Sequence, residues 1–145
     1  MANVLRQASG VSLGLHVPCE PRYLDTVRPL STRIATYLGF AEPDAGRLGE
    51  SIDAVVRRFM AGSTPDGGDA HVAVTFTVGA TAVEIWLRCH ASAVDRTNLE
   101  RDLRHAILPG GALEPIHHAM NGVHIGQEAG VAFCCLTRDL PADAT

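Results

Sequence analysis

The sequence predicts an α+β domain in which helices cover one face of an antiparallel or mixed sheet. In some stretches of the chain every second residue is apolar, which is the period of a strand, and in others apolar residues recur at about 3.6 residues, the period of a helix. The chain passes from the first kind of stretch to the second and back two times. The predicted elements come in runs: one strand, two helices, a hairpin, two further helices and a second hairpin. Such runs are typical of a two-layer α/β sandwich. The 145 residues, 46% of them hydrophobic, suffice for one domain of this kind.

The first half of the chain predicts one strand and two helices. Apolar residues alternate with small or polar ones over residues 11–17, as in a half-buried strand. Residues 23–40 predict a helix that stops at Gly39, with Pro29 causing a kink or a late start. Its apolar residues at helical spacing are Leu24, Val27, Leu30, Ile34 and Leu38. A second helix is predicted over residues 43–62, with a core side formed by Leu48, Ile52, Val55, Val56 and Phe59.

The second half predicts two hairpins with two helices between them. A loop at 63–69 leads into strands at 72–78 and 83–89, joined at Gly79 and Ala80. The other predicted elements are a helix at 98–107, a break at 109–111, a short helix at 113–120, and strands at 123–125 and 131–137. We expect residues 12–138 to form the domain, with 1–11 a flexible N-terminus and 139–145 a loose tail.

Composition excludes several classes of protein. The net charge of −4 leaves no basic footprint, so we expect no nucleic-acid partner. No apolar run reaches the roughly 18 residues of a membrane span, and the N-terminus has no apolar signal core, so we expect a cytoplasmic protein. The four cysteines lack metal-type spacing and are expected to be reduced and buried. Cys134 and Cys135 are adjacent, so on a strand they point to opposite faces.

The region before and along the first helix carries a recognisable pattern. A strand ending at Pro18 is followed by Pro21-Arg22-Tyr23-Leu24, by Val27-Arg28 on the helix, and by Gly39-Phe40 at its end. In these residues, and in the order of its elements over 12–138, the chain resembles the serine-kinase anti-sigma factors. These are small bacterial members of the superfamily that includes histidine-kinase, Hsp90 and gyrase ATPase domains. The resemblance implies the histidine kinase-like (Bergerat) form of the two-layer sandwich.

The residues that the family uses for magnesium and nucleotide are mostly replaced. The family carries Glu-x-x-x-Asn on the second helix; matching the apolar positions places Ala54 at the Glu and Arg58 at the Asn. A shift by one residue gives Asp53 and Arg57 instead. Alanine cannot orient a reacting group, and a guanidinium has no lone pair for a cation. The resemblance therefore implies a degenerate member.

Two further family motifs support the same interpretation. Asp-x-Gly-x-Gly after the second hairpin strand is replaced at Cys89 or His90, and no glycine follows. Gly-x-Gly-Leu survives in part as Gly110, Gly111 and, after Ala112, Leu113, which could offer backbone amides to an anion at a helix start. Phosphoryl transfer depends on positioning and metal electrostatics. We therefore expect a catalytically inactive protein with no ATP or magnesium cofactor.

The resemblance implies a regulatory protein that acts by binding other proteins. Its expected partner is a sigma factor, a sigma-antagonist protein, or a second copy in a homodimer. Candidate contact residues are Tyr23 and Arg28 on the first helix. Trp86 is a third candidate, because it alternates with the apolar residues of its strand and so lies on the open sheet face.

Two alternatives remain open at this point. The first is a protein that binds a nucleotide or another anion without magnesium through Arg58, Gly110, Gly111 and Leu113. The second is an ATP-dependent serine/threonine kinase with drifted motifs.

Other polar residues have plainer interpretations. One of Arg57 and Arg58 is expected to pair with Asp53 or Glu50 and the other to be solvated. Glu114 and His117 have metal-ligand spacing but lack a second pair. No nucleophile motif surrounds the cysteines and histidines. We therefore expect no catalytic residue and no metal.

Overall fold

The computed structural model describes residues 12–18, 20–61, 71–90, 93–129 and 131–141. The predicted flexible N-terminus (1–11), most of the tail (142–145) and the loop at 63–69 lie outside these residues. The described residues form β1 (Ser12–Pro18), a 3-10 turn η1 (Pro21–Tyr23), α2 (Leu24–Tyr37), α3 (Glu42–Ala61), β2 (His71–Val78), β3 (Ala82–His90), α4 (Ala93–Ile107), α5 (Pro115–Ala119), β4 (Gly122–Glu128) and β5 (Val131–Asp139).

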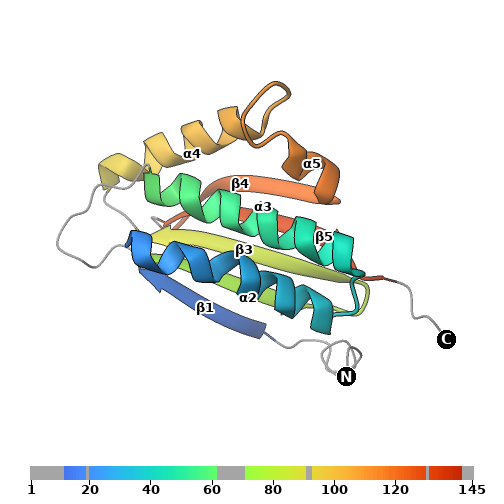
Figure 1. Cartoon of the computed structure of the whole chain (residues 1–145). Coiled ribbons are helices and arrows are strands. Elements are labelled where there is room, and N and C mark those ends of the chain that lie inside the picture. Colours follow the sequence, from blue (N-terminus) through green and yellow to red (C-terminus); the bar gives the residue numbers. More distant parts are fainter. Residues whose placement is uncertain (1–11, 19, 62–70, 91–92, 130, 142–145) are drawn as a thin grey trace.

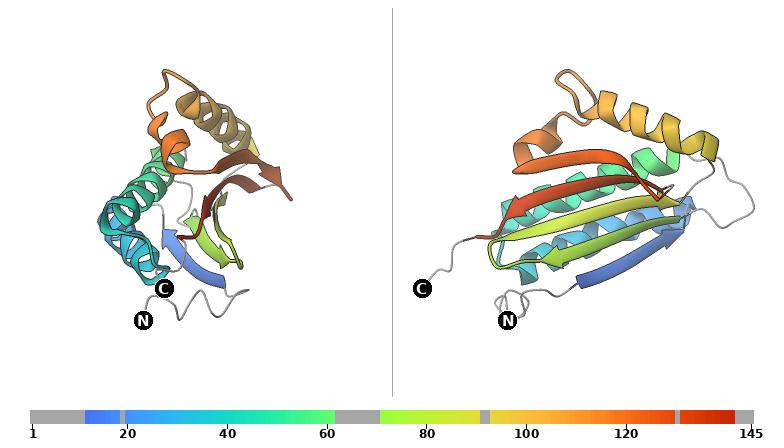
Figure 2. Two further views of the ribbon diagram at one scale, coloured as in Figure 1. Left: turned by 90° about the vertical axis from the view of Figure 1, so that its right-hand side faces the viewer. Right: turned by 180° about the vertical axis from the view of Figure 1, so that it is seen from behind.

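The five strands form one sheet in the order β1-β2-β3-β5-β4, and every neighbouring pair is antiparallel. Helices α2 and α3 lie side by side along one face (Figure 1), and α4 and α5 extend the helical layer beside β4 and β5. No described helix lies on the opposite face (Figure 2). The structure thus confirms an α+β fold with an antiparallel sheet and helices on one side.

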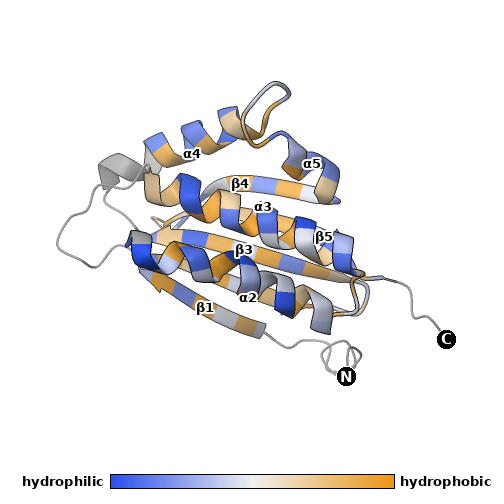
Figure 3. Ribbon diagram, viewed as in Figure 1, coloured by the Kyte–Doolittle hydropathy of each residue, from blue (hydrophilic) through white to orange (hydrophobic). Residues whose placement is uncertain are grey.

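The core forms between α3 and the inner side of the sheet. The predicted apolar side of α3 is confirmed, since Leu48, Ile52, Val55, Val56 and Phe59 are all at most 3% exposed. Alternate residues of β2 and β3 meet it: Val72, Val74, Phe76, Val78, Val83, Ile85, Leu87 and Cys89. Figure 3 shows the resulting alternation of hydrophobic and hydrophilic positions along β3. Residues at the other positions of these strands therefore face away from the helices.

Helix α2 differs from its prediction at Pro29. The helix begins at Leu24 and runs through Pro29, so the predicted late start is wrong. Pro29 and Asp25 are both exposed, so the carbonyl that loses its hydrogen bond to residue 29 lies near the solvent side. The helix ends at Tyr37, and Gly39 has φ of 99°, which confirms the glycine stop.

The second half is built as predicted but with shifted ends. Helix α4 begins at Ala93, five residues before the predicted start, and α5 covers only Pro115–Ala119. Strand β4 extends to Glu128 and pairs there with Val131, so its predicted end at residue 125 is wrong. The polar residues of β4 gave no strand signal because β4 is an edge strand. Asp139 belongs to β5, and its N–H donates to Asn121 Oδ1 (2.8 Å) rather than lying in a loose tail.

None of the helices formed by the described residues has the length and apolar character needed to cross a bilayer.

Candidate functional site

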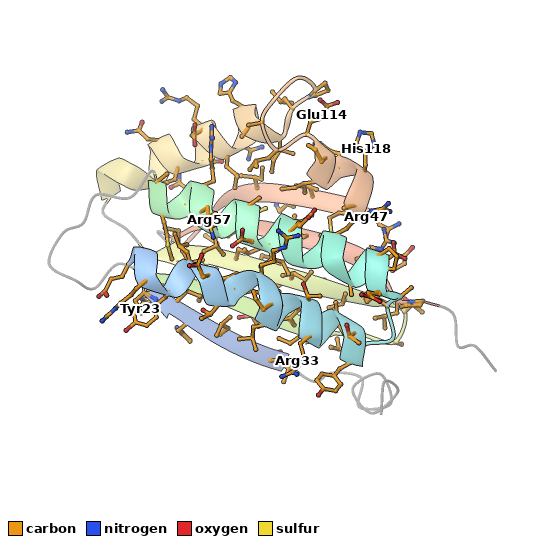
Figure 4. The ribbon with its side chains drawn as sticks, in the orientation of Figure 1. Tyr23, Arg33, Arg47, Arg57, Glu114 and His118 are labelled. Atoms are coloured by element: carbon orange, nitrogen blue, oxygen red, sulfur yellow. The ribbon has the colours of Figure 1, made fainter. Side chains whose placement is uncertain are left out.

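A cavity of about 530 Å³ lies between α3 and the segment that contains α5. One wall is the exposed side of α3, and the other is the chain from Ala112 to Ala119. The lining residues are Arg47, Glu50, Ser51, Ala54, Ala112, Leu113, Pro115, Ile116, His118 and Ala119. Arg47 and His118 lie at the same end of the molecule (Figure 4). The alanines have short side chains, so the two walls do not fill the space between them.

Three polar residues of the cavity have partners in the protein. Glu50 accepts a hydrogen bond from Arg28 Nη2 on α2 (2.6 Å). Ser51 Oγ donates to the Arg47 carbonyl (2.9 Å), and Arg47 Nη1 lies 3.7 Å from Asp44 Oδ1. The cavity therefore combines mostly apolar walls with a charged rim, which suits a small ligand with an apolar body and a polar end.

The structure separates the two residues that the motif alignment paired. Ala54 lines the cavity, with Glu50 one helical turn before it. Arg58 does not line it: its Nε and Nη2 donate to the two oxygens of Asp102 on α4 (2.8 and 3.1 Å). Arg57 pairs with Asp53 (2.9 Å), as predicted, and also with Asp25 (3.4 Å). The prediction that the other arginine is solvated is wrong, because Arg58 pairs with Asp102 across the two helices. These carboxylates hold the pKa of Arg57 above its ordinary value, with the Asp53 hydrogen bond the largest cause.

The glycines before α5 form a tight turn. Gly110 has φ of 86°, and its N–H donates to Glu114 Oε2 (3.0 Å). A Cβ at Gly111 would overlap the Ala106 carbonyl, and the Gly111 N–H donates to Leu108 O (2.8 Å). These amides, predicted to face an anion, are thus occupied by acceptors of the chain itself. Of this predicted set, only Leu113 lines the cavity.

The predicted contact residues lie on two sides of the molecule. Tyr23 is the residue directly before α2, and its ring lies 4.7 Å from the Arg22 guanidinium. Arg28 is bound to Glu50. Trp86 lies on the open sheet face beside Phe133, at 5.3 Å between ring centroids. Its Nε1 donates to Glu84 Oε2 (3.2 Å).

Sequence reasoning missed the exposed face of α2. Leu30 had been counted with the apolar residues of this helix, yet it is 39% exposed, and Tyr37 is 46% exposed. The buried side of α2 is instead formed by Val27, Ser31 and Ala35. Arg33 lies on the same outer face between Leu30 and Tyr37, at spacings of three and four. The spacing of these three residues is the signal that could have revealed this face.

The other polar residues form no metal-type cluster in the part of the chain that is described. No three histidine, cysteine, aspartate or glutamate side chains gather there to hold a metal ion. Cys89 is fully buried whereas its neighbour His90 is exposed, because successive residues of β3 face opposite sides. Burial raises the pKa of Cys134 to about 12 and, with the nearby Glu84, that of Cys135 to about 11.

Comparison with known proteins finds likeness only in structure. The sequence matches no protein-family description and no curated protein. Among solved structures, the fold is similar to that of a chain in the crystal structure of the SiaB–SiaC complex from Pseudomonas aeruginosa. The TM-score is 0.60 at 11% identity, and the alignment covers 94% of each chain. This likeness concerns the fold alone.

Proposed function

We propose that this is a regulatory protein of the anti-sigma type that acts by binding another protein rather than by catalysis. The observation that carries the proposal is the outer face of α2, where Leu30 and Tyr37 are exposed two turns apart. The fold is consistent with this role, because its structural neighbour was solved within a complex of two proteins.

The outer face of α2 has the composition of a contact surface. Two of the three large apolar side chains that are well exposed among the described residues lie on it, and the third is Leu108. Arg33 lies between Leu30 and Tyr37, and with Pro29 and Leu30 it lines a shallow hollow on α2. Tyrosine and arginine are enriched at protein interfaces. Burying a leucine fully is worth about 1.5–3 kcal/mol, so covering this face would contribute to binding.

The proposal of inactivity rests on the residues around the cavity. The side chain of Ala54 cannot orient a reacting group, and the guanidinium of Arg58, which has no lone pair for magnesium, is held by Asp102. Phosphoryl transfer needs a metal-bound phosphate chain. The proposed partner is a sigma factor, a sigma-antagonist protein or a second copy of this chain.

Site-specific photocross-linking tests the proposal. A photoreactive residue is placed at Leu30 or at Tyr37 in the protein expressed in its native host, with Leu108 as the matched exposed apolar control. We expect one discrete adduct from positions 30 and 37, identified by mass spectrometry as a regulatory protein or as this chain itself. No adduct, or the same adduct in equal yield from position 108, would contradict the proposal.

The cavity supports a second candidate function, the binding of a small ligand. Thermal melting with ATP and with ADP, each with magnesium and with EDTA, separates the possibilities. A ligand at one hundred times its Kd stabilises a protein by about 2.7 kcal/mol. A rise in Tm that survives EDTA would favour binding without metal. A rise that needs magnesium would favour a kinase with drifted motifs, and no rise in any condition would count against both.

A further inference from the structure

Both walls of the cavity between α3 and α5 are fixed by hydrogen bonds of the protein. One wall is α3, a helix of 20 residues. The other wall, residues 112–119, is held at both ends. The Leu113 N–H donates to the Ala106 carbonyl of α4 (2.8 Å), and Arg138 Nη1 donates to the Ala119 carbonyl (2.8 Å). The cavity is therefore formed in the free protein, and a ligand does not have to order its walls.

The surface of the cavity is mainly apolar. Its volume of about 530 Å³ lies within the roughly 300–1,000 Å³ of small-molecule sites. An apolar molecule that replaces water against apolar walls is favoured by the hydrophobic effect. The ligand should therefore have an apolar body. Six of the ten lining residues are apolar: Ala54, Ala112, Leu113, Pro115, Ile116 and Ala119.

Arg47 brings hydrogen-bond donors to the rim of the cavity. Its charged neighbour within the described residues is Asp44, and the 3.7 Å between Nη1 and Oδ1 exceeds hydrogen-bond distance. Asp44 also lies 3.9 Å from Arg138 Nη2, so one carboxylate serves two guanidiniums. A guanidinium carries five N–H donors in a planar fork. The side chain of Arg47 is 70% exposed, so these donors are open to a ligand.

The charges of the lining suit one negative charge better than several. Glu50 is an acid of the lining, and its carboxylate accepts from Arg28 at 2.6 Å. Arg47 is the one arginine or lysine among the ten lining residues. The phosphate chain of a nucleotide carries several negative charges, which Glu50 would repel and Arg47 alone would balance. A single carboxylate or sulfonate instead matches the fork of one guanidinium.

We propose that the cavity binds a small amphipathic monoanion, such as an aromatic carboxylic acid, with its apolar body against Leu113 and Ile116 and its carboxylate on Arg47. His118 also lines the cavity, lies at the same end of the molecule as Arg47 (Figure 4), and offers a ring nitrogen for a further hydrogen bond. The inference rests on the second candidate function, that the cavity takes a small ligand. It names a class of ligand that a titration with nucleotides does not test.

The test uses two fluorescent dyes with one skeleton. Anilinonaphthalene sulfonate carries one negative charge, and phenylnaphthylamine is the same molecule without the sulfonate. Each dye is titrated into the folded protein at about pH 7 in low salt, and its emission measures Kd. We expect both dyes to saturate, and the sulfonate to bind about fivefold more tightly. Added NaCl should reduce this preference. Naphthoate, a carboxylic acid of similar shape, should displace the sulfonate dye.

Three outcomes of these titrations would overturn the proposal. Equal affinities for the two dyes, or tighter binding of the neutral one, would contradict a site for an anion. The absence of saturable binding would contradict a ligand site of this kind. The sulfonate dye also binds partly unfolded chains, so cooperative melting of the same sample by circular dichroism is the control for a native fold.

A pair of arginine variants locates the charge that the sulfonate meets. Arg47→Gln removes the guanidinium at the cavity and should abolish the fivefold preference while the neutral dye keeps its Kd. Arg33→Gln removes one charge from the outer face of α2, where the exposed Leu30 and Tyr37 could also attract a dye (Figure 4). This variant should keep the preference. Equal losses in the two variants, or a loss confined to Arg33→Gln, would overturn the proposal.

A second pair of variants locates the apolar body. Ala54→Leu fills part of the cavity and should weaken both dyes about tenfold, because the added side chain takes the space that the ring system needs. Ala61→Leu adds the same atoms at an exposed position of the same helix and should leave both affinities unchanged. Unchanged binding in Ala54→Leu would place the dyes elsewhere and refute the assignment.

Failure of this inference can be told apart from failure of the proposed functions. A rise in Tm with ATP or ADP without dye binding would leave a ligand site in place and reject the class named here. Dye binding that follows Arg47 and Ala54 without any adduct from positions 30 and 37 would support the cavity and contradict protein binding through α2.

Discussion

Two glycines in the same helix should respond oppositely to replacement by alanine. Gly46 and Gly49 both lie in α3. A Cβ at Gly46 would meet nothing within 4 Å, so Gly46→Ala should stabilise the protein by about 0.5–1 kcal/mol through helix propensity. A Cβ at Gly49 would overlap Thr32 Oγ1 and would lie 3.0 Å from the Arg28 carbonyl oxygen of α2.

The overlap at Gly49 sets the size of the effect. Overpacking of this kind costs about 1–3 kcal/mol, which exceeds the gain in propensity. Because one contact is with backbone, α2 has to move, and α2 carries the proposed contact face. Both variants gain the same helix propensity, so we expect Gly49→Ala to be less stable than Gly46→Ala by the overpacking cost, about 1–3 kcal/mol.

Urea unfolding followed by circular dichroism measures both variants. Adding Thr32→Ala to Gly49→Ala should restore part of the loss, since the nearest atom is then gone. Equal free energies of unfolding for Gly46→Ala and Gly49→Ala would refute the close packing of α2 on α3 described here.

Three further predictions concern charge and thiols. The side chains of Arg58 and Asp102 are 37% and 48% exposed. A double-mutant cycle on this pair should give a coupling free energy of about 0.5–1 kcal/mol, and the coupling should fall in about 1 M NaCl. Zero coupling would argue against the pair. Burial holds the pKa of His90 in the folded chain below its ordinary 6.5. As the pH falls, His90 is therefore protonated in the unfolded chain before it is protonated in the folded chain. Its contribution to stability is present above about pH 6.5 and is lost as the pH falls below that value, and a His90→Gln chain should show a shallower loss between about pH 7 and 5 in urea titrations. Replacing Cys19 by serine leaves three thiols, Cys89, Cys134 and Cys135, all of them buried. The pKa of Cys134 is about 12, and these thiols should react with Ellman's reagent at about pH 8 only after unfolding. Fast reaction in the native state would contradict their burial.

The parts of the fold that periodicity predicted are those with a buried face. Periodicity alone predicted the buried side of α3, which contains Leu48, Ile52 and Phe59. It also predicted the alternation of buried and exposed residues along β2 and β3. Errors arose where local patterns are weak. Strand β4 is an edge strand with polar residues at Gln127 and Glu128, and α5 is a single short helix set by the turn at Gly110.

The candidate site was harder to predict because it depends on contacts between elements. The pairing of Arg58 with Asp102 joins residues 44 positions apart, which no spacing along α3 could reveal. The meeting of His16, His71 and His90 depends on strand order and register, and these are fixed by the whole sheet. The exposure of Leu30 was missed because a leucine at helical spacing matches a core position equally well.

The connections within the sheet bear on the order of events during folding. Only the β2–β3 and β4–β5 pairs are adjacent in the chain, and hairpins of this kind close within microseconds. Strand β1 reaches β2 only after both α2 and α3, a loop of about fifty residues whose closure costs entropy before any pairing is gained. We therefore expect β1 to join last and to leave first, so that its substitutions change the unfolding rate more than the folding rate. Since β1 carries His16, the contact between the rings of His16 and His71 would exist only once folding is complete.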